Sequence, residues 1–159
     1  MPPTIRAATE QDLERVRDLL VETWHDTYDS LMGHDKVVEM TGLWHSPRQL
    51  ATQLAAPAGS FLVAEADARI VGHAYAQAPE PDRLIVRRLY VLPDRQGQGI
   101  GAALLADLRQ RHPTARQLQL TVEAGNARAV SFYRREGFSI SADAVEGGVK
   151  VLRMTRACE

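Results

Sequence analysis

A glycine-rich stretch between an apolar run and a helical pattern constrains this chain more than any other feature of its sequence. Residues 89–105 read LYVLPDRQGQGIGAALL, in which Pro93 and Asp94 end the apolar run and residues 102–105 begin the helical pattern. Glycine adopts positive φ readily and has no Cβ to hold a ligand away from the backbone. The first amides of a helix lack partners and lie at the positive end of its dipole, so they suit a phosphate group. The stretch therefore predicts a strand, an anion-binding turn and a helix.

The rest of the chain predicts a mixed α/β fold in which strands and helices alternate irregularly. Strands are expected at residues 4–8, 61–64, 70–77, 83–92, 117–122, 138–142 and 149–155, with a hairpin turn at 66–69. Helices are expected at 13–24, from Ser46-Pro47 to about 56, from the glycine turn to about 112, and at 126–136, while residues 25–43 predict a second, irregular helix. Thr9 and Asp12 resemble the capping box of a helix start. Because no repeat or linker interrupts the pattern, we expect a single domain over residues 1–159.

Composition argues against several kinds of partner and location. The formal net charge of −1 gives no general reason to expect nucleic acid as a partner. No apolar segment approaches the roughly 20 residues that span a bilayer, and residues 1–9 lack the blocks of a signal peptide. The single cysteine, Cys158, has no internal disulfide partner, which fits a reducing compartment. We therefore expect a cytoplasmic protein with no membrane and no nucleic-acid partner.

Charge is distributed unevenly along the chain. Acidic side chains outnumber basic ones in residues 1–60, whereas arginines gather in residues 83–116. This pattern suits two ligands of opposite charge, and it suits two solvated faces equally well.

Two common phosphate-binding turns fit the glycine stretch poorly. A Walker A loop ends in Gly-Lys-Ser/Thr, but Gly101 is followed by two alanines. Gly97-x-Gly99-x-x-Ala102 matches the dinucleotide fingerprint, and Glu123 follows about 20 residues later, after a strand. However, residues 93–96 separate the apolar run from the first glycine, and too little chain follows Glu123 to complete a doubly wound sheet. A dinucleotide site is therefore a distant alternative.

A third kind of turn matches more closely. Gln96-x-x-Gly99-x-Gly101, after LYVLP, resembles the acetyl-CoA turn of the GNAT family of N-acetyltransferases. The segment NARAVSFYRREGF, which begins at Asn126, resembles the second signature of that family, and one expected strand lies between the two segments. The resemblance implies an α+β fold with a mostly antiparallel, twisted sheet of about six to seven strands. One parallel pair would splay apart, and about four helices would flank the sheet.

The resemblance also implies that acetyl-CoA is the cosubstrate. The strand backbone before the turn would pair with the pantetheine arm, and the amides of the turn would hold the pyrophosphate. The cofactor-binding residues implied are Leu89, Tyr90, Val91, Gln96, Gly97, Gln98, Gly99, Ile100, Gly101, Ala102, Asn126, Ala129 and Tyr133. Helix capping explains Asn126 equally well. No metal is expected.

Acetyl transfer to an amine requires a proton for the departing thiolate and a neutral nucleophile. The resemblance implies that Tyr133 is the proton donor, and a tyrosine with its ordinary pKa near 10 is protonated at neutral pH. The base is less clear, because Arg87 and Arg88 lie on the strand where many relatives have a glutamate, and Thr121 takes the position used by ribosomal-protein N-terminal acetyltransferases. Glu123 is the candidate base; the alternatives are His25, His73 and a chain of water molecules.

The acceptor is expected to contact residues 24–44 and the closing hairpin. Trp24, His25 and Tyr28 are the candidate contacts, and the aromatic rings and carboxylates of this segment would suit a cationic amine, although an ordinary surface explains them as well. We expect direct acetyl transfer to a primary amine of a small molecule. A protein N-terminus or lysine as acceptor, and a non-catalytic acyl-CoA sensor, are the alternatives. Dimers are common in proteins that resemble this family, so a homodimer is compatible with the resemblance.

Overall fold

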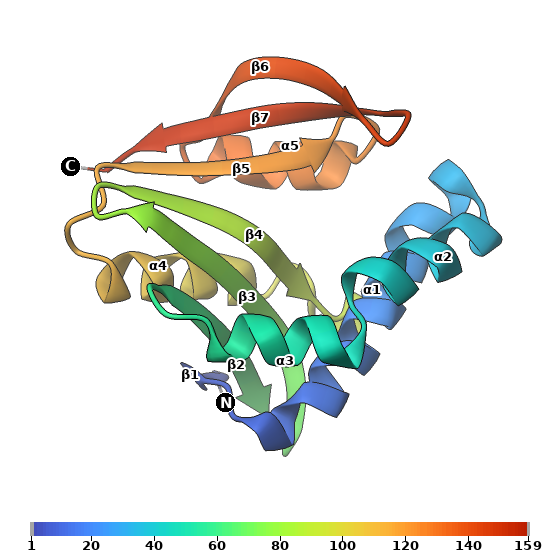
Figure 1. The fold of residues 1–159 in the computed structure, drawn as a ribbon, viewed down its shortest axis with the longest axis horizontal. Helices are drawn as coiled ribbons and strands as arrows, with labels where there is room; N and C mark the ends of the chain where they lie inside the picture. The colour runs from blue at the N-terminus through green and yellow to red at the C-terminus, as the bar shows by residue number, and fades with distance from the viewer. Residues whose placement is uncertain (1, 159) are drawn as a thin grey trace.

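Seven strands form one twisted sheet in the order β1-β2-β3-β4-β5-β7-β6 in the computed structural model, which describes residues 2–158 (Figure 1). Met1 and Glu159, the two outermost positions of the expected domain, lie outside the described residues. The strands are β1 (Thr4–Ala7), β2 (Gly59–Ala66), β3 (Arg69–Glu80), β4 (Arg83–Val91), β5 (Gln117–Glu123), β6 (Ser139–Glu146) and β7 (Val149–Ala157). Among these strands of the described residues, only β4 and β5 pair in parallel. The expected mostly antiparallel sheet is confirmed, and a doubly wound parallel sheet is excluded.

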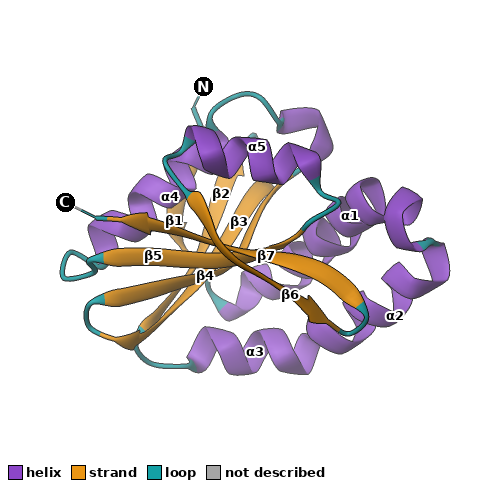
Figure 2. Cartoon of the chain, turned by 90° about the horizontal axis from the view of Figure 1, so that it is seen from above, coloured by secondary structure: helices purple, strands orange, loops and turns teal. Residues whose placement is uncertain are grey.

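Residues 2–158 contain five α-helices. They are α1 (Leu13–Met32), α2 (His34–Trp44), α3 (Pro47–Ala55), α4 (Ile100–Arg111) and α5 (Ala127–Arg135). Helix α2 packs on α1. Figure 2 shows α4 and α5 on one side of the sheet and α3 on the other. Two short 3-10 turns, Glu10–Asp12 and Pro93–Arg95, precede α1 and the glycine turn. Within residues 2–158, no helix is both long enough and apolar enough to cross a membrane.

The parallel strands β4 and β5 separate after their first halves. They pair from Arg83 opposite Gln117 as far as Val86 opposite Leu120. Strand β4 then continues to Val91, still paired on its other edge with β3, where Val91 lies opposite Gly72. The splayed pair expected from the resemblance is therefore confirmed, and residues 87–91 have no strand partner on the edge that faces β5.

The start of α1 follows the expected capping box. The Thr9 backbone N–H donates a hydrogen bond of 2.8 Å to Oδ2 of Asp12, and Asp12 also pairs with Arg6 at 2.8 Å and with Arg15 at 2.9 Å. The hydrogen bond from the Arg6 guanidinium holds the pKa of Asp12 well below its usual range, although the carboxyl is buried. The first turn is a 3-10 turn rather than α-helix, so α1 begins at Leu13.

The segment 25–43 is more regular than expected. Helix α1 continues to Met32, because Tyr28 extends its buried stripe and packs against Trp24 with ring centroids 4.6 Å apart. After Gly33, at φ 90°, α2 is a regular helix whose own buried stripe includes Val37 and Met40. The expected second helix is therefore present, but the prediction that it is irregular was wrong, as was the expected end of the first helix near residue 24.

One hairpin turn and the ends of two strands, β3 and β6, bear on the strand predictions. The hairpin turn at 66–69 is confirmed, with positive φ at Asp67 and Ala68. Strand β3 runs through Pro79 to Glu80, further than expected, because the register shifts between Gln77 and Glu80 and the ladder needs no N–H from the proline there. Strand β6 also extends past its expected end at residue 142, since it pairs with β7 as far as Glu146.

Candidate functional site

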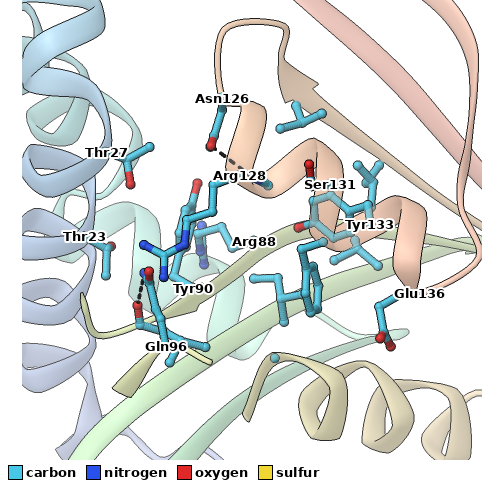
Figure 3. A pocket seen from close by; sticks show the side chains of 18 of the residues that line it. Thr23, Thr27, Arg88, Tyr90, Gln96, Asn126, Arg128, Ser131, Tyr133 and Glu136 are labelled. Atoms are coloured by element: carbon cyan, nitrogen blue, oxygen red, sulfur yellow. Dashed lines mark hydrogen bonds between the residues drawn. The ribbon is translucent and has the colours of Figure 1, made fainter. Parts of the chain in front are cut away.

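A cleft of about 690 Å³ opens where β4 and β5 separate (Figure 3). Its walls come from α1, the second half of β4, the glycine turn with the start of α4, the end of β5, and α5. All of the expected cofactor-binding residues line it except Gln98, whose side chain is exposed on the turn. The two sequence segments that resemble the acetyltransferase signatures therefore meet at one site.

Each glycine of the turn has a definite structural role. Gly97 and Gly99 have φ of 79° and 83°, a conformation that strains residues with a Cβ. A Cβ on Gly101 would lie 3.1 Å from the Phe132 ring, so this glycine allows α4 to pack closely on α5. Gly99 is also the N-cap of α4 and offers no capping side chain. The first amides of α4 are therefore available to an anion in the cleft.

Tyr133 lies on α5 with its ring packed between Phe132 and Phe138, at centroid distances of 5.3 and 5.5 Å. The residue is 8% exposed, and its hydroxyl makes no hydrogen bond to the described residues. Figure 3 shows this hydroxyl turned toward the space between α5 and α1. Burial raises the pKa of Tyr133 above its ordinary value, and the neighbouring Tyr90 and Glu123 add to the shift. Tyr133 is therefore protonated across the physiological range and can donate a proton into the cleft.

A hydrogen-bonded group joins three elements at the end of β5. The Tyr28 hydroxyl on α1 donates to Oε2 of Glu123 at 2.5 Å, and Nδ2 of Asn126 donates to the same hydroxyl at 3.1 Å. Oδ1 of Asn126 accepts from the Ala129 N–H at 3.2 Å and so caps α5. Burial, above all, raises the pKa of Tyr28, so its hydroxyl remains a donor. Glu123 is thus held in one orientation beside the cleft, and Asn126 both caps a helix and lines the site.

The expected acceptor residues divide between the cleft and its surroundings. Tyr28 lines the cleft, whereas Trp24 lies just behind the wall, where its Nε1 donates to the Tyr90 hydroxyl at 3.1 Å. Burial raises the pKa of that Tyr90 hydroxyl to about 12. His25 lies outside the cleft, since it hydrogen-bonds Asp29 at 2.7 Å and stacks on His34 with centroids 4.7 Å apart. The structure therefore brings Tyr28 and Trp24 together with Glu123 and Tyr90, and leaves His25 apart.

His25, Asp29 and His34 form a second cluster, at the junction of α1 and α2. Their donor atoms lie within 4.8 Å of one another, and among residues 2–158 they are the one group of histidine, cysteine and acidic side chains that could hold a metal ion. No sequence signal singled out this group. It is separate from the cleft, whose lining includes none of the three.

His73, the other candidate base, is fully buried on β3 and does not line the cleft. Its Nδ1 donates to the Leu62 carbonyl at 2.8 Å, and its Nε2 accepts from Nε of Arg88 at 3.1 Å. Burial and the Arg88 charge hold the pKa of His73 well below its usual value. Because both ring nitrogens are engaged, His73 has no lone pair to offer an acceptor amine.

Several cleft residues received no role from the sequence. Thr23 and Thr27 lie on α1, one helical turn apart, and Arg88 and Arg128 reach the cleft from β4 and α5 (Figure 3). Thr23 and Thr27 are four residues apart, so the sequence alone could have indicated that they share one face of α1, the face that lines the cleft. Arg88 lies two residues from Tyr90 on the same strand face, but nothing in the sequence indicates that its side chain is buried.

Comparisons with known proteins agree with this geometry. Residues 32–158 match the family model described as an acetyltransferase (GNAT) domain. The chain is 35% identical over 125 residues to a mycothiol acetyltransferase from Jonesia denitrificans, which covers 74% of this chain but only 36% of that protein. It is 33% identical over 98 residues to an uncharacterized N-acetyltransferase from Mycobacterium tuberculosis, covering 60% of this chain and 63% of the relative. The chain thus spans about a third of the mycothiol acetyltransferase it matches.

A solved structure with the same fold covers nearly the whole chain. It is the crystal structure of the PaiA N-acetyltransferase from Thermoplasma acidophilum in complex with coenzyme A, with a TM-score of 0.90 and 22% identity. The match covers 99% of this chain and 100% of that one.

Proposed function

This chain belongs to the GNAT acetyltransferase family, and from that premise we propose that it transfers an acetyl group from acetyl-CoA to a primary amine of a small molecule. The observation that carries the proposal is the separation of β4 from β5, which leaves an open cleft with the glycine turn at one end and Tyr133 beside it. The relatives named mycothiol acetyltransferase support a small-molecule acceptor.

The proposed cosubstrate fits the unpaired edge of β4. Residues 89–91 have backbone groups with no strand partner toward β5, so they can pair with the amides of a pantetheine arm as an added strand would. The amides from Gly97 to Ala102 suit the pyrophosphate, as described above for the start of α4. Arg95, Arg128 and Arg135 line the same cleft and add positive charge near the phosphates. Coenzyme A in the PaiA structure supports this assignment.

The proposed chemistry is a direct transfer. Acetyl-CoA supplies an activated acetyl group, whose carbonyl carbon forms a bond to the amine nitrogen as its bond to sulfur breaks. Glu123 accepts the proton that the amine nitrogen loses, and the hydrogen bond from Tyr28 fixes the direction of its carboxylate. Tyr133, which its raised pKa keeps protonated at neutral pH, donates its phenolic proton to the departing thiolate. Solvent restores the protonation state of both side chains.

Residues 1–159 are proposed to form one acetyltransferase domain, because a single sheet contains all the strands of the described residues. A cytoplasmic location is proposed as well, on the single cysteine, Cys158, which is free.

Thiol release tests the proposal. The protein is incubated with acetyl-CoA and a panel of small primary amines, together with peptides that have free N-termini or lysines, and free CoA thiol is measured. Release with small amines is expected. Release with peptides alone would move the acceptor to a protein. Native mass spectra that contain a CoA adduct, without release for any member of a broad panel, would indicate a sensor instead of an enzyme.

A further inference from the structure

The buried guanidinium of Arg88 has no carboxylate partner among residues 2–158. Arg88 is 6% exposed and lines the cleft, yet it takes part in none of the ion pairs of the described residues. Its Nε donates to Nε2 of His73 at 3.1 Å, and its Nη2 is buried without any hydrogen-bond partner. By contrast, Arg6 pairs with Asp12, and Arg95 pairs with Asp67 at 3.0 Å. Burying a cation without a counter-ion costs free energy of folding, and no described carboxylate offsets that cost for Arg88.

The side chains that contact Arg88 carry no negative charge. Its guanidinium carbon lies 4.8 Å from the centroid of the Tyr75 ring and 5.5 Å from that of Phe61. His73 is held neutral, and burial together with the charges of Arg88 and Arg17 lowers the pKa of His45 to about 3. Burial lowers the pKa of Arg88 itself to about 10, so the guanidinium is still charged at neutral pH. The aromatic faces stabilise this charge partly, and the Nη2 hydrogens remain unsatisfied.

Arg88 lies on the side of the sheet opposite the glycine turn. Gly72 on β3 faces Ile100 and Leu104 of α4. His73 and Tyr75, which contact Arg88, are one and three residues further along β3 and so point to the opposite face. Arg88 therefore projects from the face that α1 covers, as does Tyr90, whose hydroxyl accepts from Trp24 of α1. A pyrophosphate bound at the start of α4 lies on the other face. Arg88 is thus placed in the acceptor half of the cleft, which Thr23 and Thr27 of α1 line on the opposite side (Figure 3).

We propose that Arg88 binds a carboxylate group of the acceptor, so that the substrate is an amino carboxylate such as a free amino acid. This inference rests on the proposed function and narrows its acceptor. A guanidinium and a carboxylate form two parallel, charge-assisted hydrogen bonds, and the single negative charge of a carboxylate matches the single charge of Arg88. The substrate amine would then face Glu123 from the same half of the cleft.

The same geometry disfavours a polycationic acceptor. The carboxylates of residues 24–44 were expected to attract such an amine, but Asp26 and Asp29 of that segment do not line the cleft. A second positive charge on the substrate would be repelled by Arg88, whose own charge is buried and little screened by water.

The test compares matched pairs of acceptors, each an amino acid and its own carboxamide, in the thiol-release assay with acetyl-CoA. The wild-type protein should use the acid with a kcat/KM about 10- to 100-fold higher than the amide, mainly through KM. The amide has the less basic amine, so a larger fraction of it is in the neutral, nucleophilic form near neutral pH, and a preference for the acid cannot arise from the availability of free amine. Arg88→Gln should abolish the preference by weakening only the acid. Arg83→Gln, on the same strand outside the cleft, is the matched control and should retain it.

A second measurement covers the chance that Arg88→Gln fails to fold. The des-amino carboxylate of the best acceptor should inhibit the wild-type protein competitively against the amine, whereas its carboxamide should not. Equal use of acid and amide by the wild-type protein would overturn the proposal. An equal loss of kcat/KM for acid and amide in a folded Arg88→Gln variant would also overturn it, because Arg88 would then act at the thioester. Activity with carboxylate-free amines alone would also overturn it, whereas failure with every amine would contradict the proposed function itself.

Discussion

The Tyr28 hydroxyl donates a hydrogen bond of 2.5 Å to Glu123, and so fixes a carboxylate at the end of β5 from a residue on α1. The two residues are 95 positions apart in the sequence. Asn126 donates to the same hydroxyl, so the signature helix α5 shares the contact. The proposed base on β5 is therefore joined to α1 and to the start of α5 by hydrogen bonds.

Glu123→Gln should lower kcat about 100-fold while leaving acetyl-CoA affinity nearly unchanged. The glutamine can still accept the hydrogen bond from Tyr28, so the geometry persists, but it cannot accept a proton from the amine. Steady-state kinetics and calorimetric titration of CoA measure the two effects. Glu146→Gln, an exposed change on β6, is the control. A kcat within twofold of wild type would remove Glu123 as the base and favour a water chain.

Tyr133→Phe should lower kcat about 100-fold with little change in the dissociation constant of CoA, because the ring packing persists and only the proton is lost. The wild-type pH profile gives a second test. Since burial raises the pKa of Tyr133, the residue keeps its proton beyond the ordinary value near 10, so kcat should not fall between about pH 8 and 10. A decline in kcat with a midpoint below 10 in the wild type, absent from Tyr133→Phe, would contradict the raised pKa.

The glycine turn and the parallel splay were the parts of the molecule most open to prediction from sequence. Positive φ at Gly97 and Gly99 follows from local chemistry, and the segment from Asn126 adds a second local signal. The extent of α1 was harder to predict, because Tyr28 is held by contacts with Trp24 and Glu123 rather than by local spacing alone. Periodicity in residues 25–43 does not reveal a partner that lies on β5.

Gly99→Ala should weaken CoA binding roughly 5- to 30-fold, which corresponds to the cost of placing a Cβ at φ 83°. Acetyl-pantetheine lacks the pyrophosphate, so its KM should change little. Gly42→Ala is the matched control, since a Cβ there meets no atom within 4 Å and its φ is not positive. Equal weakening of CoA and acetyl-pantetheine would argue that the turn does not bind the pyrophosphate.

Asp12→Asn should lower the free energy of unfolding by about 1–3 kcal/mol at pH 7, because the buried carboxylate loses its charge-assisted bonds to Arg6 and Arg15. The folded-state pKa of Asp12 is depressed, so its contribution is complete above the unfolded pKa near 3.9 and is lost as the pH falls toward the folded value. The difference between wild type and variant in urea denaturation should therefore shrink below about pH 4. Asp143→Asn, exposed on β6, should change neither value. A difference that stayed constant down to pH 2 would contradict this linkage.

The site itself shows where prediction from sequence stops. The carboxylates of residues 24–44 suggested a cationic acceptor, but Asp29 binds His25 outside the cleft. Arg88 lies on a strand where many relatives have a glutamate, and only the packing of Tyr75 and His73 around it reveals a buried, unpaired charge. Burial depends on contacts between distant strands and cannot be derived from the residue type.

Transfer of a labelled acetyl group shows directly whether the protein moves acetyl from acetyl-CoA to an amine. The protein is incubated with acetyl-CoA labelled in its acetyl group and an excess of a primary amine that carries a carboxylate, and the label is followed by mass spectrometry. The label should appear on the amine nitrogen in step with the release of free CoA, and Tyr133→Phe should slow both together. Label that remained on CoA, or that appeared as free acetate, would contradict the proposed transfer.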